Sequence, residues 1–281
     1  MDGAALAAKI RAQVAEEVQE LGELGLATVQ VGEDEASTIY LRLKHKAASE
    51  VEIASVDHKV PHEITEDEVL ALVAELNADE AIDGILVQLP LPDHIDEARV
   101  IAAVDPVKDV DGFHPFNAGQ LYLGRPTHVP ATPLGVMALL AEYRIPLDGA
   151  RAVVVGRSNI VGKPVAHLLL QAHSTVTICH SHTDDLARHT LDADVLVVAA
   201  GVAEVVSADM VKSGSAVVDV GINRTESGLV GDVDPDAAAR AAFLTPVPGG
   251  VGPMTIAMLL QSTIKAARYR RGLLAFPKNR R

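Results

Sequence analysis

Polar side chains able to exchange protons or bind a polar ligand gather at three points of this sequence. Tyr40 and Lys44 stand four residues apart, a spacing that places both on one face of a helix. Gln88 interrupts the otherwise apolar segment GILVQL, and Asp111 lies in DVDG at the start of a long loop. Each also has a structural explanation: a solvated lysine on a charged helix, a glutamine bonded to nearby backbone, and an Asx turn.

A second candidate site follows the apolar segment RAVVV. Gly156, Arg157, Ser158 and Gly162 belong to a turn between this predicted strand and a helix. Such a turn directs free backbone amides and the helix dipole at a phosphate group. The glycine spacing is one residue longer than in G-x-G-x-x-G, and a tight turn needs glycine for backbone reasons alone. The surrounding βαβ pattern favours the nucleotide site.

The next predicted strand ends in HSHT, which contains Ser181 and His182. A site selective for NAD usually has an acid here to bind the adenosine ribose, and none is present. Hydroxyls and imidazoles fit a 2′-phosphate better, so NADP is expected and NAD is less favoured. Gly201 and Ile222 follow two later strands, where a dinucleotide passes close to the strand ends. Cys179 is interpreted as core filler.

The segment PVPGGVGPMT is rich in glycine and proline, and it contains Pro248, Gly249 and Gly250. Three glycines and three prolines in ten residues indicate a rigid loop whose backbone is closely approached. Such a loop could lie against a flat ligand, or it could be a hinge between domains.

Composition narrows the class of protein. The 281 residues carry a net charge of −14, and aromatic residues make up only 3%. An acidic surface with few aromatic rings argues against nucleic-acid binding. One cysteine excludes an internal disulfide framework, no apolar run is long enough to span a bilayer, and the N-terminus resembles no signal peptide. A cytoplasmic protein of two domains is expected, without a membrane or metal site.

The periodicity of apolar residues predicts an α/β fold. Thr65 and Glu68 form a capping-box pattern, and the Pro- and Gly-rich stretch 106–133 is interpreted as a functional loop or linker. Alternation of helix and strand in the second half indicates a doubly wound, Rossmann-like parallel sheet. The expected helices are 4–21, 37–49, 65–76, 134–143, 163–172, 184–189 and 255–271, and the expected strands are 26–31, 51–59, 84–89, 151–155, 174–179, 194–199 and 215–220.

Six segments together resemble one family, the bifunctional methylenetetrahydrofolate dehydrogenase/methenyltetrahydrofolate cyclohydrolases. The resemblance covers nearly the whole chain, and its QLPLP and PGGVGPMT motifs are highly specific. The matching text is VGEDEASTIYLRLKHKAA at 31–48, GILVQLPLP at 84–92, KDVDGFHPFNAGQL at 108–121, ATPLGV at 131–136, GRSNIVGKPVAHLLL at 156–170 and PGGVGPMT at 248–255.

The resemblance implies a role for each candidate residue. Lys44 would be the acid–base group of the cyclohydrolase step, Tyr40 would stack on or orient the folate, and Gln88 would tune the lysine. Asp111 would hold the pterin, and the 248–250 loop would lie beside both ligands. In the cofactor half, residues 156–158 would bind the phosphates of NADP, and the backbone at Ile222 would approach the nicotinamide.

The family also implies two lobes with a cleft between them. A folate-binding catalytic domain of residues 1–128, the smaller α/β domain, would be completed by the C-terminal helix, 254–281, and residues 129–253 would form the NAD(P)-binding domain. The family usually forms a homodimer and serves one-carbon metabolism, including purine biosynthesis. Its partners are tetrahydrofolate derivatives.

The sequence departs from the family pattern at a few positions. Glu35, Glu52 and Ala131 replace Pro, Gly and Cys, and none of the three is a proposed catalytic position. His182 replaces a frequent Lys or Arg, which bears on the strength of the NADP preference. Three alternatives stay open: a monofunctional dehydrogenase with weak or absent cyclohydrolase activity, a nucleotide sensor without turnover, and another NADP oxidoreductase such as a shikimate-type enzyme.

Overall fold

The computed structural model describes residues 1–226 and 228–277, and the chain forms two compact units. The five-stranded unit consists of Met1–Ala8 and Pro130–Thr255. The three-stranded unit consists of Lys9–Val129 and the chain from Ile256 onward. No helix of the described residues is long and apolar enough to cross a membrane.

The first eight residues do not belong with the unit to which the sequence assigned them. The backbone N–H of Ala4 donates to the Gly249 carbonyl at 3.0 Å, and the Met1 amino group donates to the Leu244 carbonyl. Gly3 lies so close to Gly250 that a Cβ on Gly3 would be 1.8 Å from the Gly250 oxygen. These backbone contacts group the start of α1 (Gly3–Leu21) with the five-stranded unit.

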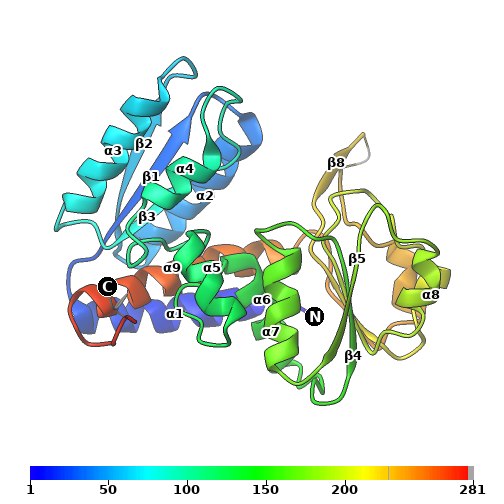
Figure 1. The fold of residues 1–281 in the computed structure, drawn as a ribbon. Coiled ribbons are helices and arrows are strands. Elements are labelled where there is room, and N and C mark those ends of the chain that lie inside the picture. The colour runs from blue at the N-terminus through cyan, green and yellow to red at the C-terminus, as the bar shows by residue number, and fades with distance from the viewer. Residues whose placement is uncertain (227, 278–281) are drawn as a thin grey trace. The chain divides into compact units, whose positions relative to one another are not determined.

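The three-stranded unit contains the strands β1 (Gly25–Val31), β2 (Ala54–Val60) and β3 (Gly84–Val87), in the order β2-β1-β3 and all parallel. Its helices include α2 (Glu35–Glu50), α3 (Glu66–Ala78), α4 (Glu97–Ala103) and α5 (Pro115–Tyr122) (Figure 1). This unit was expected to be the smaller of the two. Its sheet has fewer strands than that of the other unit, but the unit does not contain fewer residues.

The central strand β1 is buried along its whole length, so its two sets of alternating side chains face different partners. Ala27, Val29 and Val31 pack in one apolar cluster with residues of α3 and α4. On the other face, Thr28 and Gln30 make hydrogen bonds to side chains of α2. The sheet thus holds α2 by polar contacts on the face opposite its main apolar cluster.

The five-stranded unit contains a wholly parallel sheet in the order β10-β7-β6-β4-β5. Numbered along this unit, the order is 2-1-3-4-5, one of the common doubly wound arrangements. Its topological switch point lies between β4 and β6. The strands are β4 (Arg151–Val155), β5 (Thr175–Cys179), β6 (Val195–Val198), β7 (Ala216–Asp219) and β10 (Phe243–Leu244).

The five-stranded unit also contains helices, 3-10 turns and a hairpin. Its α-helices are α6 (Ala131–Glu142), α7 (Gly162–Gln171) and α8 (Leu186–Thr190), and its short 3-10 turns are Ala208–Met210 and Pro235–Ala239. A small antiparallel hairpin joins β8 (Asn223–Thr225) to β9 (Gly228–Val230).

Several element boundaries differ from the sequence-based expectation. Strand β2 begins at Ala54, because Val51 and Glu52 form a turn after α2 in which Glu52 has φ 61°. The supposed loop 106–133 contains helix α5, whose Pro115 occupies the first turn, where a missing N–H costs nothing. Helix α4 was not anticipated.

The last helix, α9 (Val251–Arg270), begins earlier than expected and includes Pro253 in its first turn. From Ile256 onward it belongs to the three-stranded unit. There Arg270 forms an ion pair with buried Asp83 at 2.7 Å, and Lys265 donates to the Thr127 carbonyl.

The capping box predicted at the start of α3 is present. Thr65 Oγ1 accepts the Glu68 N–H at 3.3 Å, and the Glu68 carboxylate accepts the Thr65 N–H at 2.9 Å. Two amides that would otherwise lack helical partners are thereby satisfied.

Replacing the capping hydroxyl should destabilise the three-stranded unit. We expect Thr65→Ala to lower the free energy of unfolding by about 1 kcal/mol, because the Glu68 amide loses its acceptor. Urea unfolding followed by circular dichroism measures the change. Thr65→Ser keeps the hydroxyl and should unfold close to the wild type. Equal midpoints for Thr65→Ala and wild type would show that the cap contributes nothing.

Candidate active site

The structure brings Lys44 and Gln88 into direct contact. Lys44 lies on α2, and Gln88 directly follows β3, where its backbone N–H donates to the Val29 carbonyl at 2.8 Å. The Gln88 amide nitrogen donates to the carbonyl of Leu89 at 2.8 Å. This contact leaves the amide oxygen, Oε1, to accept a hydrogen bond from Lys44 Nζ at 3.1 Å. Gln88 therefore fixes the position of the lysine amine.

The Lys44 side chain is buried, and only 8% of the residue surface is exposed. Burial lowers the pKa of its amine, because a charged ammonium is disfavoured away from water. The Tyr40 ring, one helical turn earlier, has its centroid 5.9 Å from Lys44 Nζ. A buried amine beside an aromatic ring and an amide oxygen is suited to proton transfer.

Asp111 influences the same amine through its charge. The segment that precedes it runs beside β3, where the Ile85 N–H donates to the Lys108 carbonyl at 2.7 Å. Desolvation raises the pKa of Asp111 to about 7, while the positive charge of Lys44 opposes that rise. In return, the Asp111 carboxylate raises the pKa of Lys44 and partly offsets the effect of burial. The four residues predicted at this site are thus linked by contacts or charge.

Asp109 was not selected from the sequence, although it belongs to the same DVDG motif. Its buried carboxylate accepts the N–H groups of Phe113 and His114 at 3.3 and 2.9 Å, and the Asn117 side-chain amide at 2.8 Å. These bonds fold the chain around Asp111. Asp109 therefore holds the loop that carries Asp111.

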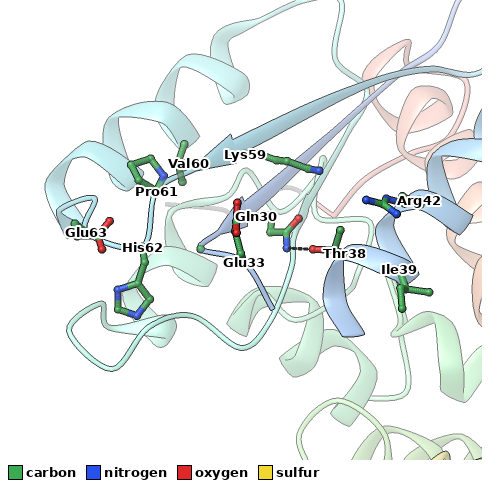
Figure 2. Close-up of a pocket in the computed structure, with 11 residues that line it drawn as sticks. Gln30, Glu33, Thr38, Ile39, Arg42, Lys59, Val60, Pro61, His62 and Glu63 are labelled. Carbon is green, nitrogen blue, oxygen red and sulfur yellow. Dashed lines mark hydrogen bonds between the residues drawn. The ribbon is translucent and has the colours of Figure 1, made fainter. Parts of the chain in front are cut away.

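A pocket of about 930 Å³ opens on the other flank of α2, at the carboxyl ends of β1 and β2. Figure 2 shows Thr38 and Arg42 of α2 on one side, with Gln30 of β1 and Lys59 of β2. Thr38 and Arg42 are displaced by two residues from the candidate pair on α2, which rotates them to the opposite side of the helix. The described residues that line this pocket do not include the four catalytic candidates.

The positions predicted to bind a dinucleotide follow four strands of the five-stranded unit. Residues 156–162 follow β4, residues 181 and 182 follow β5, Gly201 follows β6, and Ile222 follows β7. The strands are parallel, so these segments meet at one edge of the sheet, which includes the switch point. The described structure thus collects all of these residues where doubly wound sheets bind ligands.

The turn after β4 is crowded, and its first amides are not all free. A Cβ on Gly156 would lie 2.1 Å from the Ala199 oxygen, and one on Gly162 would lie 2.2 Å from the Gly156 oxygen. Ser158 Oγ accepts the N–H groups of Val161 and Gly162 at 3.1 and 3.3 Å. The expectation of free amides at this turn is therefore wrong for residues 161 and 162, because a side chain of the turn already caps them.

The side chains expected near a 2′-phosphate are exposed. Arg157, Ser158, Ser181 and His182 all reach solvent at this edge of the sheet. The His182 backbone N–H donates to Nδ1 of His180 at 3.1 Å, so the turn after β5 is held by a histidine ring. A permanent guanidinium with exposed hydroxyls and imidazoles has the donor chemistry that a phosphate needs.

The 248–250 loop lies at the start of α1 within the five-stranded unit. A Cβ on Gly250 would be 2.6 Å from the Pro246 oxygen, and Gly249 has φ 105°. Close backbone approach explains Gly250, and the positive φ explains Gly249, without a ligand in either case. Contact of Pro248, Gly249 and Gly250 with a substrate stays a prediction.

Comparison with known proteins decides the family. The model of the tetrahydrofolate dehydrogenase/cyclohydrolase catalytic domain matches residues 1–111, and that of its NAD(P)-binding domain matches residues 130–271. The chain belongs to the tetrahydrofolate dehydrogenase/cyclohydrolase family. This membership confirms the predicted family and α/β fold class.

Individual relatives match over almost their whole length. The chain is 56% identical over 276 residues to the bifunctional protein FolD of Halothermothrix orenii, covering 96% of this chain and 98% of that protein. The bifunctional enzyme FolD of Campylobacter jejuni has a crystal structure with a TM-score of 0.94 and 50% identity, covering 96% and 98% of the two chains. The Trypanosoma brucei enzyme, solved with NADP and an inhibitor, has a TM-score of 0.92 and 40% identity, with 98% of each chain covered.

The family match bears on two of the alternatives left by the sequence. A shikimate-type oxidoreductase is disfavoured, because both halves of the chain match folate-enzyme domains. A sensor without turnover would leave the buried pair of Lys44 and Gln88 unexplained.

The protonation of Lys44 offers a direct test of the site. The Asp111 carboxylate, when ionised, raises the pKa of Lys44 through its negative charge. We expect Asp111→Asn to lower the Lys44 pKa further, because the negative charge that raises it is lost. Side-chain NMR of protein with isotope-labelled lysine gives the midpoint. An unchanged or raised midpoint would contradict the assigned coupling.

Proposed function

We propose that this chain oxidises methylenetetrahydrofolate to methenyltetrahydrofolate with NADP and then hydrolyses the product to formyltetrahydrofolate, with Lys44 as the proton-transfer group of the hydrolysis. Family membership supports the pair of reactions. The hydrogen bond between Lys44 Nζ and Gln88 Oε1 carries the assignment of Lys44, because it fixes a buried amine of lowered pKa.

The hydrolytic step needs a group that accepts a proton from water. Water attacks the bridge carbon of the methenyl cation, and the neutral amine of Lys44 takes the proton that the water loses. A C–O bond forms, one C–N bond breaks, and the released folate nitrogen receives a proton, so that the overall reaction releases one proton. A cationic substrate beside Lys44 favours the neutral amine, as burial does.

The oxidative step depends on alignment more than on acid–base chemistry. NADP accepts a hydride from the methylene bridge, which leaves a cation delocalised over two folate nitrogens. We assign Tyr40 to stacking against the folate and Asp111 to holding the pterin. Pro248, Gly249 and Gly250 are assigned to the substrate as well. These residues contribute by orienting the reactants.

We assign the NADP site to the carboxyl edge of the five-stranded sheet and the folate chemistry to the three-stranded unit. The first assignment is supported by the position of the predicted dinucleotide-binding segments at the edge that includes the switch point, and by the exposed side chains of Arg157, Ser158, Ser181 and His182. Gly156, Gly162, Gly201 and Ile222 would supply close backbone approach. A homodimer, a cytoplasmic location and a place in purine biosynthesis also belong to this proposal, on family resemblance.

A monofunctional dehydrogenase is the second candidate. The intact set of Tyr40, Lys44 and Gln88 favours the bifunctional enzyme, because oxidation alone would not need a buried amine. Incubation with methylenetetrahydrofolate and NADP separates the two. Cofactor reduction reports the oxidation, and decay of the methenyl absorbance reports the hydrolysis.

Removing the Lys44 amine should separate the two activities. We expect Lys44→Met to lower cyclohydrolase activity by about 10²–10⁴-fold or more, the usual contribution of one acid–base group, while some dehydrogenase activity and NADP binding persist. Both rates are measured on one preparation. Lys46→Met removes an exposed lysine of the same helix and serves as the control. Hydrolysis near the wild-type rate in Lys44→Met would overturn this mechanism.

The cofactor preference should depend on the side chains expected at the 2′-phosphate. The guanidinium of Arg157 is a planar fork of donors that suits a phosphate, so we expect a higher kcat/KM with NADP than with NAD. The measurement is kcat/KM for both cofactors under the same conditions. His182→Gln should reduce this preference and leave the Arg157 contribution. Equal efficiency with NADP and NAD would refute the assignment.

A further inference from the structure

Two buried carboxylates of the five-stranded unit have no part in the mechanism above. Asp219 is the last residue of β7, and Asp232 follows β9. Asp219 is 3% exposed and Asp232 is 0% exposed. Charged groups are rarely buried so completely unless they accept several hydrogen bonds. Their partners therefore indicate what these residues do.

Asp232 joins two segments that follow neighbouring strands. Its Oδ2 accepts the backbone N–H groups of Ala200 and Gly201, in the turn that follows β6, at 2.7 and 2.8 Å. Its Oδ1 accepts the side-chain amide of Asn223 at 2.8 Å, and Asn223 directly follows Ile222. One carboxylate thus ties the turn at Gly201 to the turn at Ile222.

Asp219 holds the backbone of Asp232 in place through hydrogen bonds. The Asp219 carboxylate accepts the backbone N–H groups of Gly221, Asp232 and Val233 at 3.0, 2.9 and 3.0 Å. Burial raises its pKa to about 6, although these three bonds favour the ionised form. The Thr245 hydroxyl donates to the Asp219 carbonyl at 3.3 Å and accepts the Asp219 N–H at 2.8 Å.

The two carboxylates pack directly against backbone positions that only glycine can occupy. A Cβ on Gly221 would lie 2.1 Å from Asp232 Oδ1, and one on Gly231 would lie 1.8 Å from Asp219 Oδ2. Two glycines therefore stand where any side chain would collide with a carboxylate oxygen. The network is a rigid support whose members fit one another.

We propose that Asp232 is a positioning residue for NADP, because it fixes the backbone turns at Gly201 and Ile222 through the amides of residues 200 and 201 and the side chain of Asn223. The inference rests on the proposed cofactor site. Asp232 itself is buried and acts through these groups. Its contribution is to keep both turns in one arrangement before the cofactor binds.

Exchanging the donor and the acceptor tests this role. Asp232→Asn keeps an oxygen for the amides of Ala200 and Gly201 but places an NH₂ group against the NH₂ of Asn223. Asn223→Asp places two carboxylates together. The double variant Asp232→Asn/Asn223→Asp restores a donor–acceptor pair with the original net charge. Because Asn223 also makes two longer contacts, at 3.3 Å with the Gly231 carbonyl and 3.5 Å with that of Val230, recovery should be partial.

The expected result is a selective loss of NADP binding. Each single variant should raise the Kd for NADP by about tenfold or more, the usual effect of losing a hydrogen bond to a charged group. The double variant should bind NADP more tightly than either single variant. Isothermal titration of the intact protein gives the Kd. The KM for methylenetetrahydrofolate and the cyclohydrolase rate should stay unchanged. Asp236→Asn, an exposed acid nearby, is the matched control.

Three outcomes would overturn the inference. The first is an unchanged Kd for NADP in both folded single variants, and the second is a double variant that binds NADP no more tightly than the single variants. The third is a loss of folate affinity and cyclohydrolase rate as large as the loss of NADP affinity, which indicates general destabilisation. If Asp232→Asn does not fold, Asn223→Ala is the second variant. It removes the bond from Asn223 to Asp232 together with the two longer contacts of Asn223, keeps the bonds of Asp232 to Ala200 and Gly201, and should still weaken NADP binding selectively. A wild-type protein that binds no NADP would refute the proposed function itself.

Discussion

Parallel pairing of the strands is the constraint on which both candidate sites depend. In each of the two main sheets, every crossover returns the chain to the same end, so the carboxyl ends of the strands collect at one edge. Gln88 follows β3 at such an edge, and the residues at 156–162, 201 and 222 follow strands at another. Parallel pairing alone therefore brings residues that are far apart in the sequence to the same edge of a sheet.

The two edges use burial for opposite purposes. In the three-stranded unit, an amine is buried with one neutral acceptor, so the charged form of Lys44 is disfavoured and its neutral form is suited to the proposed proton transfer. In the five-stranded unit, buried carboxylates receive three hydrogen bonds each from backbone and side-chain amides. A carboxylate satisfied in this way holds the chain in place, whereas an under-satisfied amine can react.

The sequence predicts the parts of this protein that follow from local rules. Helical spacing places Tyr40 and Lys44 together, and the capping box marks the start of α3. Helix α5 was missed because its Pro- and Gly-rich text has loop composition, and it is held instead by tertiary bonds such as that of Asn117 to Asp109. Asp232 was missed because its partners at 200, 201 and 223 become neighbours only when parallel strands align.

Glycine proved a less specific signal than acidic residues at the nucleotide edge. Gly156 and Gly162 are each required by a backbone oxygen about 2 Å from the position of a Cβ, which holds whether or not a phosphate binds. The GDVD segment that follows β9 is a more specific signal for this edge of the sheet. A buried carboxylate such as that of Asp232 must accept several hydrogen bonds, and its donors show which backbone turns it holds. At this edge the turns at Gly201 and Ile222 are therefore better identified through the residues that support them than through glycine alone.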